Sequence, residues 1–277
     1  MSRRVPGSFV NPVFGLCALL SCAWAESAPQ RSDPSAPFER AYALADYRGA
    51  ERLARDAAAT TAGSPSATHR AVWWIAAGSA AIQDGRPGDA IDAYARGALL
   101  GGHPGRESLA LRSRALAEAK LFLSARRSFD ALARRFPYAR ASGADERLVL
   151  AIDRALAGRS ATSGLLTWHT QQAAQALDSD RPGLAWAHAC EARILARLFD
   201  AAPPEDALVI GAAACLTMES PETALAMLDL IPEPSRGHAT RIARMRDAAG
   251  QWSALRSASS AHFRNQAGTT TAPTWID

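Results

Sequence analysis

The stretch Trp73–Ala90, WWIAAGSAAIQDGRPGDA, contains the pattern that decides the fold. Its first tryptophan is followed thirteen residues later by Arg-Pro-Gly and then by an alanine, and the same pattern recurs over Trp168–Ala185. In both copies an apolar, helix-forming stretch leads through a Pro-Gly turn into a second such stretch. Self-similarity of this kind is typical of stacked helical hairpins. We therefore expect an array of hairpins, an architecture that usually binds other molecules.

The composition favours helices over sheets. The chain is 48% hydrophobic but only 7% aromatic, and alanine, leucine and arginine are abundant. Small and unbranched side chains of this kind suit closely packed helices. Lys120 is the only lysine among the 31 basic residues, and the net charge is +4. This modest charge, without interleaved aromatic residues, does not indicate a nucleic-acid-binding protein.

Two consecutive units show how such hairpins would pack. The first carries the small pair Ala77-Gly78, then Ala90 and Tyr94, and ends at Pro104. The second runs from Arg106 to Pro137, so that the two prolines are 33 residues apart. This pattern of large and small residues resembles the tetratricopeptide repeat (TPR), a 34-residue unit. Residues 136–139, Phe-Pro-Tyr-Ala, are similar to repeats of bacterial outer-membrane TPR lipoproteins.

The resemblance implies an all-α fold, a right-handed superhelical solenoid of antiparallel helix hairpins. It covers residues 38–261 in degenerate form. One amphipathic stretch, 145–157, has no clear partner and interrupts the phase of the repeats. A polar tail is expected at 262–277. The expected hairpins are 38–59, 73–104, 106–137, 168–199, 204–231 and 238–261, the last of them turning at Gly250-Gln251-Trp252.

The N-terminus predicts export. Two arginines precede an apolar stretch that ends in Ala23-Trp24-Ala25, which is the layout of a signal peptide over residues 1–25. A second interpretation is a bacterial lipobox, in which Cys22 becomes the lipidated first residue. Residues 26–37 contain three prolines among polar residues and predict an extended tether. We expect a periplasmic or outer-membrane-attached protein that contacts a membrane only if Cys22 is lipidated.

The sequence offers little for catalysis. It contains no phosphate-binding loop, no H-E-x-x-H, no Cys-x-x-Cys and no G-x-S-x-G motif. His169 is expected on a helix surface, and His188 is expected to be packed or solvated rather than bound to a metal. Asp180 precedes a Pro-Gly turn and fits turn chemistry. We therefore predict no enzyme activity, no cofactor and no metal site.

The TPR resemblance places a partner-binding groove on the first helix of each hairpin. The side chains expected to face this groove form a mixed, mildly polar surface that suits an extended peptide or a partner helix. They are Ile75, Ser79, Gln83, Arg114, Glu118, Thr170 and Asp178.

A second candidate surface is basic. Residues 106–140 contain nine basic side chains against three acidic ones, and Arg126-Arg127 and Arg134-Arg135 recur eight residues apart. This patch predicts either a solvated outer face or a binding surface for an acidic partner, anionic lipid headgroups or a charged glycan. Outside the signal peptide, Cys190 and Cys215 fall on neighbouring helices and are either a disulfide or two free thiols.

Together these features predict an exported, non-enzymatic TPR-like scaffold that binds proteins in the cell envelope. One alternative is an outer-membrane lipoprotein that assists the assembly of envelope components or of a secretion system. Another is a helical accessory protein for an enzyme that acts on the cell wall or on glycans.

Overall fold

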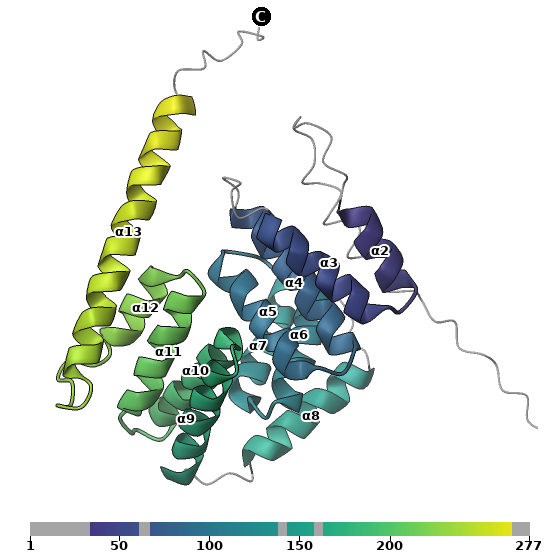
Figure 1. The fold of residues 1–277 in the computed structure, drawn as a ribbon. Coiled ribbons are helices and arrows are strands. Elements are labelled where there is room, and N and C mark those ends of the chain that lie inside the picture. The colour runs from purple at the N-terminus through teal and green to yellow at the C-terminus, as the bar shows by residue number, and fades with distance from the viewer. Residues whose placement is uncertain (1–33, 61–66, 138–142, 158–162, 268–277) are drawn as a thin grey trace, which may run out of the picture.

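The computed structural model describes residues 34–60, 67–137, 143–157 and 163–267, which form twelve helices and no strand (Figure 1). The all-α prediction is therefore confirmed for these residues. None of their helices is both long enough and apolar enough to cross a bilayer. The helices are α2 (Ser35–Ala43), α3 (Tyr47–Thr60), α4 (Ala67–Gln83), α5 (Pro87–Leu99), α6 (Arg106–Glu118), α7 (Phe122–Arg135), α8 (Gly143–Ala157), α9 (Ser163–Asp178), α10 (Pro182–Leu198), α11 (Glu205–Thr217), α12 (Pro221–Leu228) and α13 (Ala239–Ala267).

Five hairpins in the described residues share one turn. Between α4 and α5, the amide of Gly85 donates to the carbonyl of Ile82 and that of Arg86 donates to the carbonyl of Ala81. These two bonds, around a residue with positive φ, make a Schellman helix end. The same pair of bonds ends the first helix of α2–α3, α6–α7, α9–α10 and α11–α12. At these five turns the residue with positive φ is, in order, Ala45, Gly85, Lys120, Asp180 and Glu219.

The second helix of every hairpin carries an alanine five residues after this turn position. These alanines let the two helix axes approach because they add only a methyl group at the crossing. All are fully buried, with 0% of their surface exposed: Ala50, Ala90, Ala125, Ala185 and Ala224. The first helices of the last four hairpins place a small buried residue seven positions before the turn: Gly78, Ser113, Ala173 and Ala212.

The hairpins do not follow one another in a simple line. Helix α10 packs on α5 as well as on α9, α11 and α7, so the second and fourth hairpins are direct neighbours (Figure 1). Gly183 makes this possible: its amide donates to Oδ1 of Asp92 at 2.7 Å. A Cβ at position 183 would lie 2.5 Å from the carbonyl oxygen of Asp92. The two sequence repeats therefore meet in space.

Helix α8, the stretch without a clear partner, packs on α7 and α6. Its Ile152 is buried in the same apolar cluster as Phe129 of α7. The third hairpin and α8 thus branch away from the direct contact between α5 and α10. This branch is the place where the regular order of the sequence repeats is lost.

One expected hairpin and two expected domain boundaries differ from the structure. Residues 238–261 do not form a hairpin, because α13 runs unbroken through Gly250 to Ala267. Glycine inside a helix costs about 1 kcal/mol relative to alanine. It ends the helix only where its φ is positive or a proline follows. The tail expected from residue 262 therefore begins within α13, and its residues 268–277 lie outside the described part. The tether expected up to residue 37 gives way to α2 at Ser35.

Candidate functional site

The structure buries two of the residues expected to line a groove. Ser79 has 0% of its surface exposed, and its hydroxyl lies 3.0 Å from the Tyr94 hydroxyl and 3.4 Å from that of Ser108. Ile75 is buried in the cluster that contains Tyr94. The expectation that these two side chains face a partner is wrong, because α6 packs directly on this side of α4.

The other expected groove residues do not form one surface. Gln83 is half-buried and lies near Tyr42, whose pKa is raised to about 12, chiefly by burial. Arg114 and Glu118 of α6 are exposed and pair with each other at 2.8 Å. The remaining two belong to α9, which packs on α10 and α11: Thr170 donates to a carbonyl of its own helix, and Asp178 is exposed.

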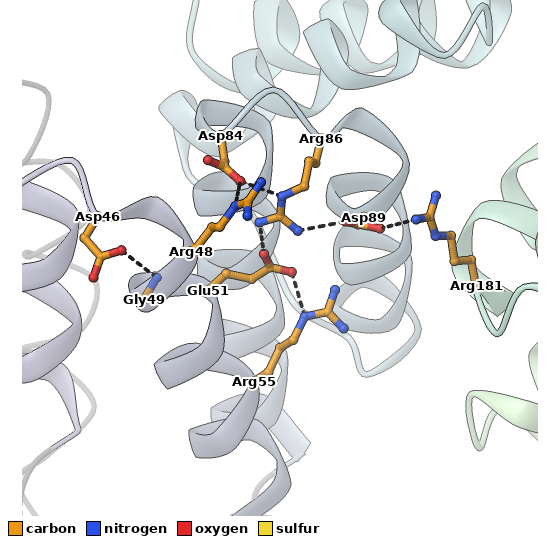
Figure 2. Close-up of polar contacts among 9 residues, drawn as sticks. All are labelled: Asp46, Arg48, Gly49, Glu51, Arg55, Asp84, Arg86, Asp89 and Arg181. Carbon is orange, nitrogen blue, oxygen red and sulfur yellow. Dashed lines mark hydrogen bonds and ion pairs between the residues drawn. The ribbon is translucent and has the colours of Figure 1, made fainter.

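The helix turns are joined by an ion-pair network (Figure 2). Arg86 binds Glu51 of α3, Asp84 at 2.6 Å and Asp89 at 2.7 Å. Burial opposes its charge, but the three carboxylates outweigh burial and raise its pKa. Arg181, the equivalent residue in the second repeat, reaches Asp89 at 3.2 Å. The Arg-Pro-Gly arginines thus hold neighbouring hairpins together, a structural role that explains why the pattern repeats.

The arginines of the basic patch on α7 differ in their partners. Arg126 pairs with Asp130 at 3.3 Å and with Asp153 of α8 at 2.8 Å. Arg135 donates to the Pro104 carbonyl at 3.0 Å and lies over the ring of Phe136. Arg127 and Arg134 are exposed, and neither forms an ion pair with a described residue. Seven residues apart, these two lie on the same side of the helix.

Glu191 fixes the position of this helix. It is buried on α10, and its Oε1 accepts from the amide of Leu123 at 2.8 Å. Its Oε2 accepts from the amide and the hydroxyl of Ser124 at 2.9 and 2.6 Å. The first turn of α7 has no acidic residue of its own, so this carboxylate supplies the anion that a helix N-terminus favours. Glu191 is not among the residues predicted from the sequence; its one signal there is a lone carboxylate in an apolar, alanine-rich helix.

A third arginine adjoins the exposed pair. Both Arg193 of α10 and Arg127 lie close enough to Cys190 to favour its thiolate, although burial dominates and raises the pKa of Cys190 to about 11. The Nε of Arg193 is buried and finds no hydrogen-bond acceptor among the described residues. We call the exposed pair Arg127 and Arg134 the α7 arginine surface.

The two cysteines are free thiols in this structure, so the disulfide alternative is not formed here. Burial raises the pKa of Cys215 as well, and the neighbouring Cys190 adds to this effect. Neither thiol is therefore activated as a nucleophile. The candidate lipidation residue, Cys22, lies outside the described residues.

His169 and His188 form a buried pair. His169 has 0% of its surface exposed, so the expectation of a surface position is wrong. Its Nδ1 lies 3.1 Å from Nδ1 of His188, and the Trp168 ring packs edge-on against both imidazoles. Burial lowers the pKa of His188 to about 4. Among the described residues, no group of three or more potential ligands is placed to hold a metal ion.

No protein-family model, curated protein or solved structure matches this chain.

Proposed function

We propose that this chain is an exported, non-enzymatic scaffold of TPR type that binds an acidic protein partner in the cell envelope. In this proposal the hairpins belong to a right-handed superhelical solenoid whose regular order is interrupted at the third hairpin and α8. Five hairpins with one turn geometry and one buried alanine position support a repeat architecture. Repeat arrays present extended surfaces, and binding is their usual task.

The observation that carries the proposal is the exposure of Arg127 and Arg134 on a helix whose start is fixed. Glu191 holds the N-terminus of α7 with three hydrogen bonds, so the two guanidinium groups project from a rigid support. Exposed guanidinium groups on a rigid support suit the carboxylates of an acidic segment, which they bind in paired geometry.

Titration of the chain with polyglutamate at low ionic strength tests this proposal. The double variant Arg127→Glu, Arg134→Glu should weaken binding at least about tenfold, because two attractions become repulsions. The matched control is Arg40→Glu with Arg52→Glu on α2 and α3, since both residues are exposed and the change of charge is the same. Equal weakening in the control would mean that net charge alone attracts polyglutamate, and would overturn the assignment of the site.

Export is tested by the intact mass of the mature chain. Removal of residues 1–25 would leave a chain that starts at Glu26 and is not lipidated. A chain that starts at an acylated Cys22 would instead favour the outer-membrane lipoprotein, with the tether holding the helical domain away from its membrane. Recovery of the full-length chain from the cytoplasm would contradict export in either form.

A further inference from the structure

Helix α13 occupies the position of the first helix of a hairpin. The first helix of the third hairpin, α6, packs on both helices of the preceding hairpin, α4 and α5. In the same way α11 packs on α9 and α10, and α13 packs on α12 and α11. In the described residues, however, no second helix follows α13, whose distal half projects beyond α12 (Figure 1). Among the described residues, no helix occupies the place that a second helix of this hairpin would take.

A groove marks the start of this open face. It lies between α11 and α13, with a volume of about 380 Å³. Leu216 and Met245 supply apolar surface, and Arg241 and Arg244 are exposed at its edge. No carboxylate lines it.

The face of α13 that lines the groove continues past it. At 3.6 residues per turn, Arg241, Arg244, Met245 and Ala248 lie on one side of the helix, and Trp252 and Leu255 extend the same side. Leu255 is 68% exposed and Trp252 is 36% exposed. Residues on the adjoining side, such as Ile242 and Ala249, are buried instead. The open face is therefore an apolar stripe with two arginines at one end.

The charge of this face selects its occupant. The one acidic residue of α13, Asp247, lies about a third of a turn away from the stripe. A parallel pairing with a second copy of the chain would bring the same arginines against these, and like charges oppose that contact. An amphipathic helix with leucine-type residues on one side and carboxylates beside them would match both the stripe and the arginines.

We infer that the α11–α13 groove and the stripe Arg241–Leu255 form a docking site for an acidic amphipathic helix of a partner protein. The incoming helix lies where the second helix of a hairpin would pack on α13, so that the two form a sixth hairpin between chains. Its apolar side covers Met245, Trp252 and Leu255, and its carboxylates pair with Arg241 and Arg244. This site would serve the scaffold role proposed above, but it is built from different helices than the α7 arginine surface, so each can be tested without the other.

Two designed peptides test this site. Both are amphipathic helices of about four turns with leucines on one side; one has glutamates and the other lysines beside the leucines. Fluorescence anisotropy of each labelled peptide with the full chain measures affinity. We expect the glutamate peptide to bind at least about tenfold more tightly than the lysine peptide. Arg241→Glu with Arg244→Glu should reverse this preference, and Trp252→Ala with Leu255→Ala should weaken binding of both peptides.

The variants at the α7 arginine surface are the control. Arg127→Glu with Arg134→Glu should leave binding of the glutamate helix within about twofold, because those residues belong to the other surface. All four substituted side chains of the α13 site are partly or fully exposed, and thermal melting checks that the variants remain folded. The inference is overturned if the two peptides bind equally or not at all. It is also overturned if the Trp252 and Leu255 substitutions instead abolish self-association of the chain or binding to anionic vesicles.

Discussion

The amide of Gly183 donates a 2.7 Å hydrogen bond to the buried carboxylate of Asp92, joining two helices whose sequences repeat each other. The two residues come from the second and fourth hairpins, 91 positions apart. This contact places the two copies of the Arg-Pro-Gly pattern side by side, with Arg181 of one paired to Asp89 of the other. The repeat is therefore also an interface.

Substitution of Gly183 tests this interface. Gly183→Ala would place a methyl group 2.5 Å from the backbone of Asp92, so α10 must move away from α5. We expect a loss of about 1–3 kcal/mol in the free energy of unfolding, measured by urea denaturation. The matched control is Gly88→Ala, where the nearest atom is the end of the Arg181 side chain at 3.2 Å. A similar loss in both variants would mean that close approach at Gly183 is not what matters.

Lys120 tests the shared turn. It has a φ of 62°, a conformation that costs a residue with a Cβ about 1–2 kcal/mol. Lys120→Gly should therefore stabilise the chain by about 0.5–1 kcal/mol, since the relief of strain exceeds the entropy that glycine adds to the unfolded state. The converse, Gly85→Ala, should destabilise it, although a Cβ there would meet no neighbouring atom. Melting temperatures that shift in opposite directions in the two variants would support the common geometry, whereas shifts in the same direction would contradict it.

Glu191 tests how α7 is held. Glu191→Ala would leave the amides of Leu123 and Ser124 without their acceptor, at a cost of about 2–3 kcal/mol. Hydrogen exchange should quicken in the first turn of α7 more than elsewhere. Glu118→Ala is the control, because this exposed carboxylate pairs only with Arg114 and such pairs contribute less than about 1 kcal/mol. Unchanged exchange in α7 would show that the helix does not depend on Glu191.

The buried histidine pair predicts a dependence of stability on pH. Because the pKa of His188 falls from 6.5 to about 4 on folding, the unfolded chain binds more protons between these values. Stability should therefore be independent of this group above pH 6.5 and decrease as the pH falls towards 4. The loss is at most about 3 kcal/mol. His188→Gln should flatten this part of the curve relative to the native chain; parallel curves for the two proteins would contradict the assignment.

Features of the fold that depend on a local sequence pattern could be predicted. The repeated Trp–Arg-Pro-Gly–Ala pattern predicts two helical hairpins, and its alanines, Ala90 and Ala185, are fully buried in the second helix of each. The common turn was not recognised, because a left-handed backbone at Ala45 or Lys120 leaves no mark in the residue type.

Long-range contacts explain the remaining errors. Ser79 was placed on a groove, but the approach of α6 buries it, and the burial of His169 depends on how α9 meets α10. Glu191 contacts residues 67 and 68 positions away, a distance that no helical period encodes. A motif can predict a hairpin, whereas the surface that the hairpins leave exposed depends on how they pack.

Hydrogen exchange of the chain with and without polyglutamate tests the central claim most directly, because it locates the bound acidic polymer. We predict added protection of the backbone amides in residues 122–135. This added protection should be lost in the double variant Arg127→Glu, Arg134→Glu. Protection confined to other helices, or binding with no change in α7, would contradict the claim that this scaffold holds its partner at the α7 arginine surface.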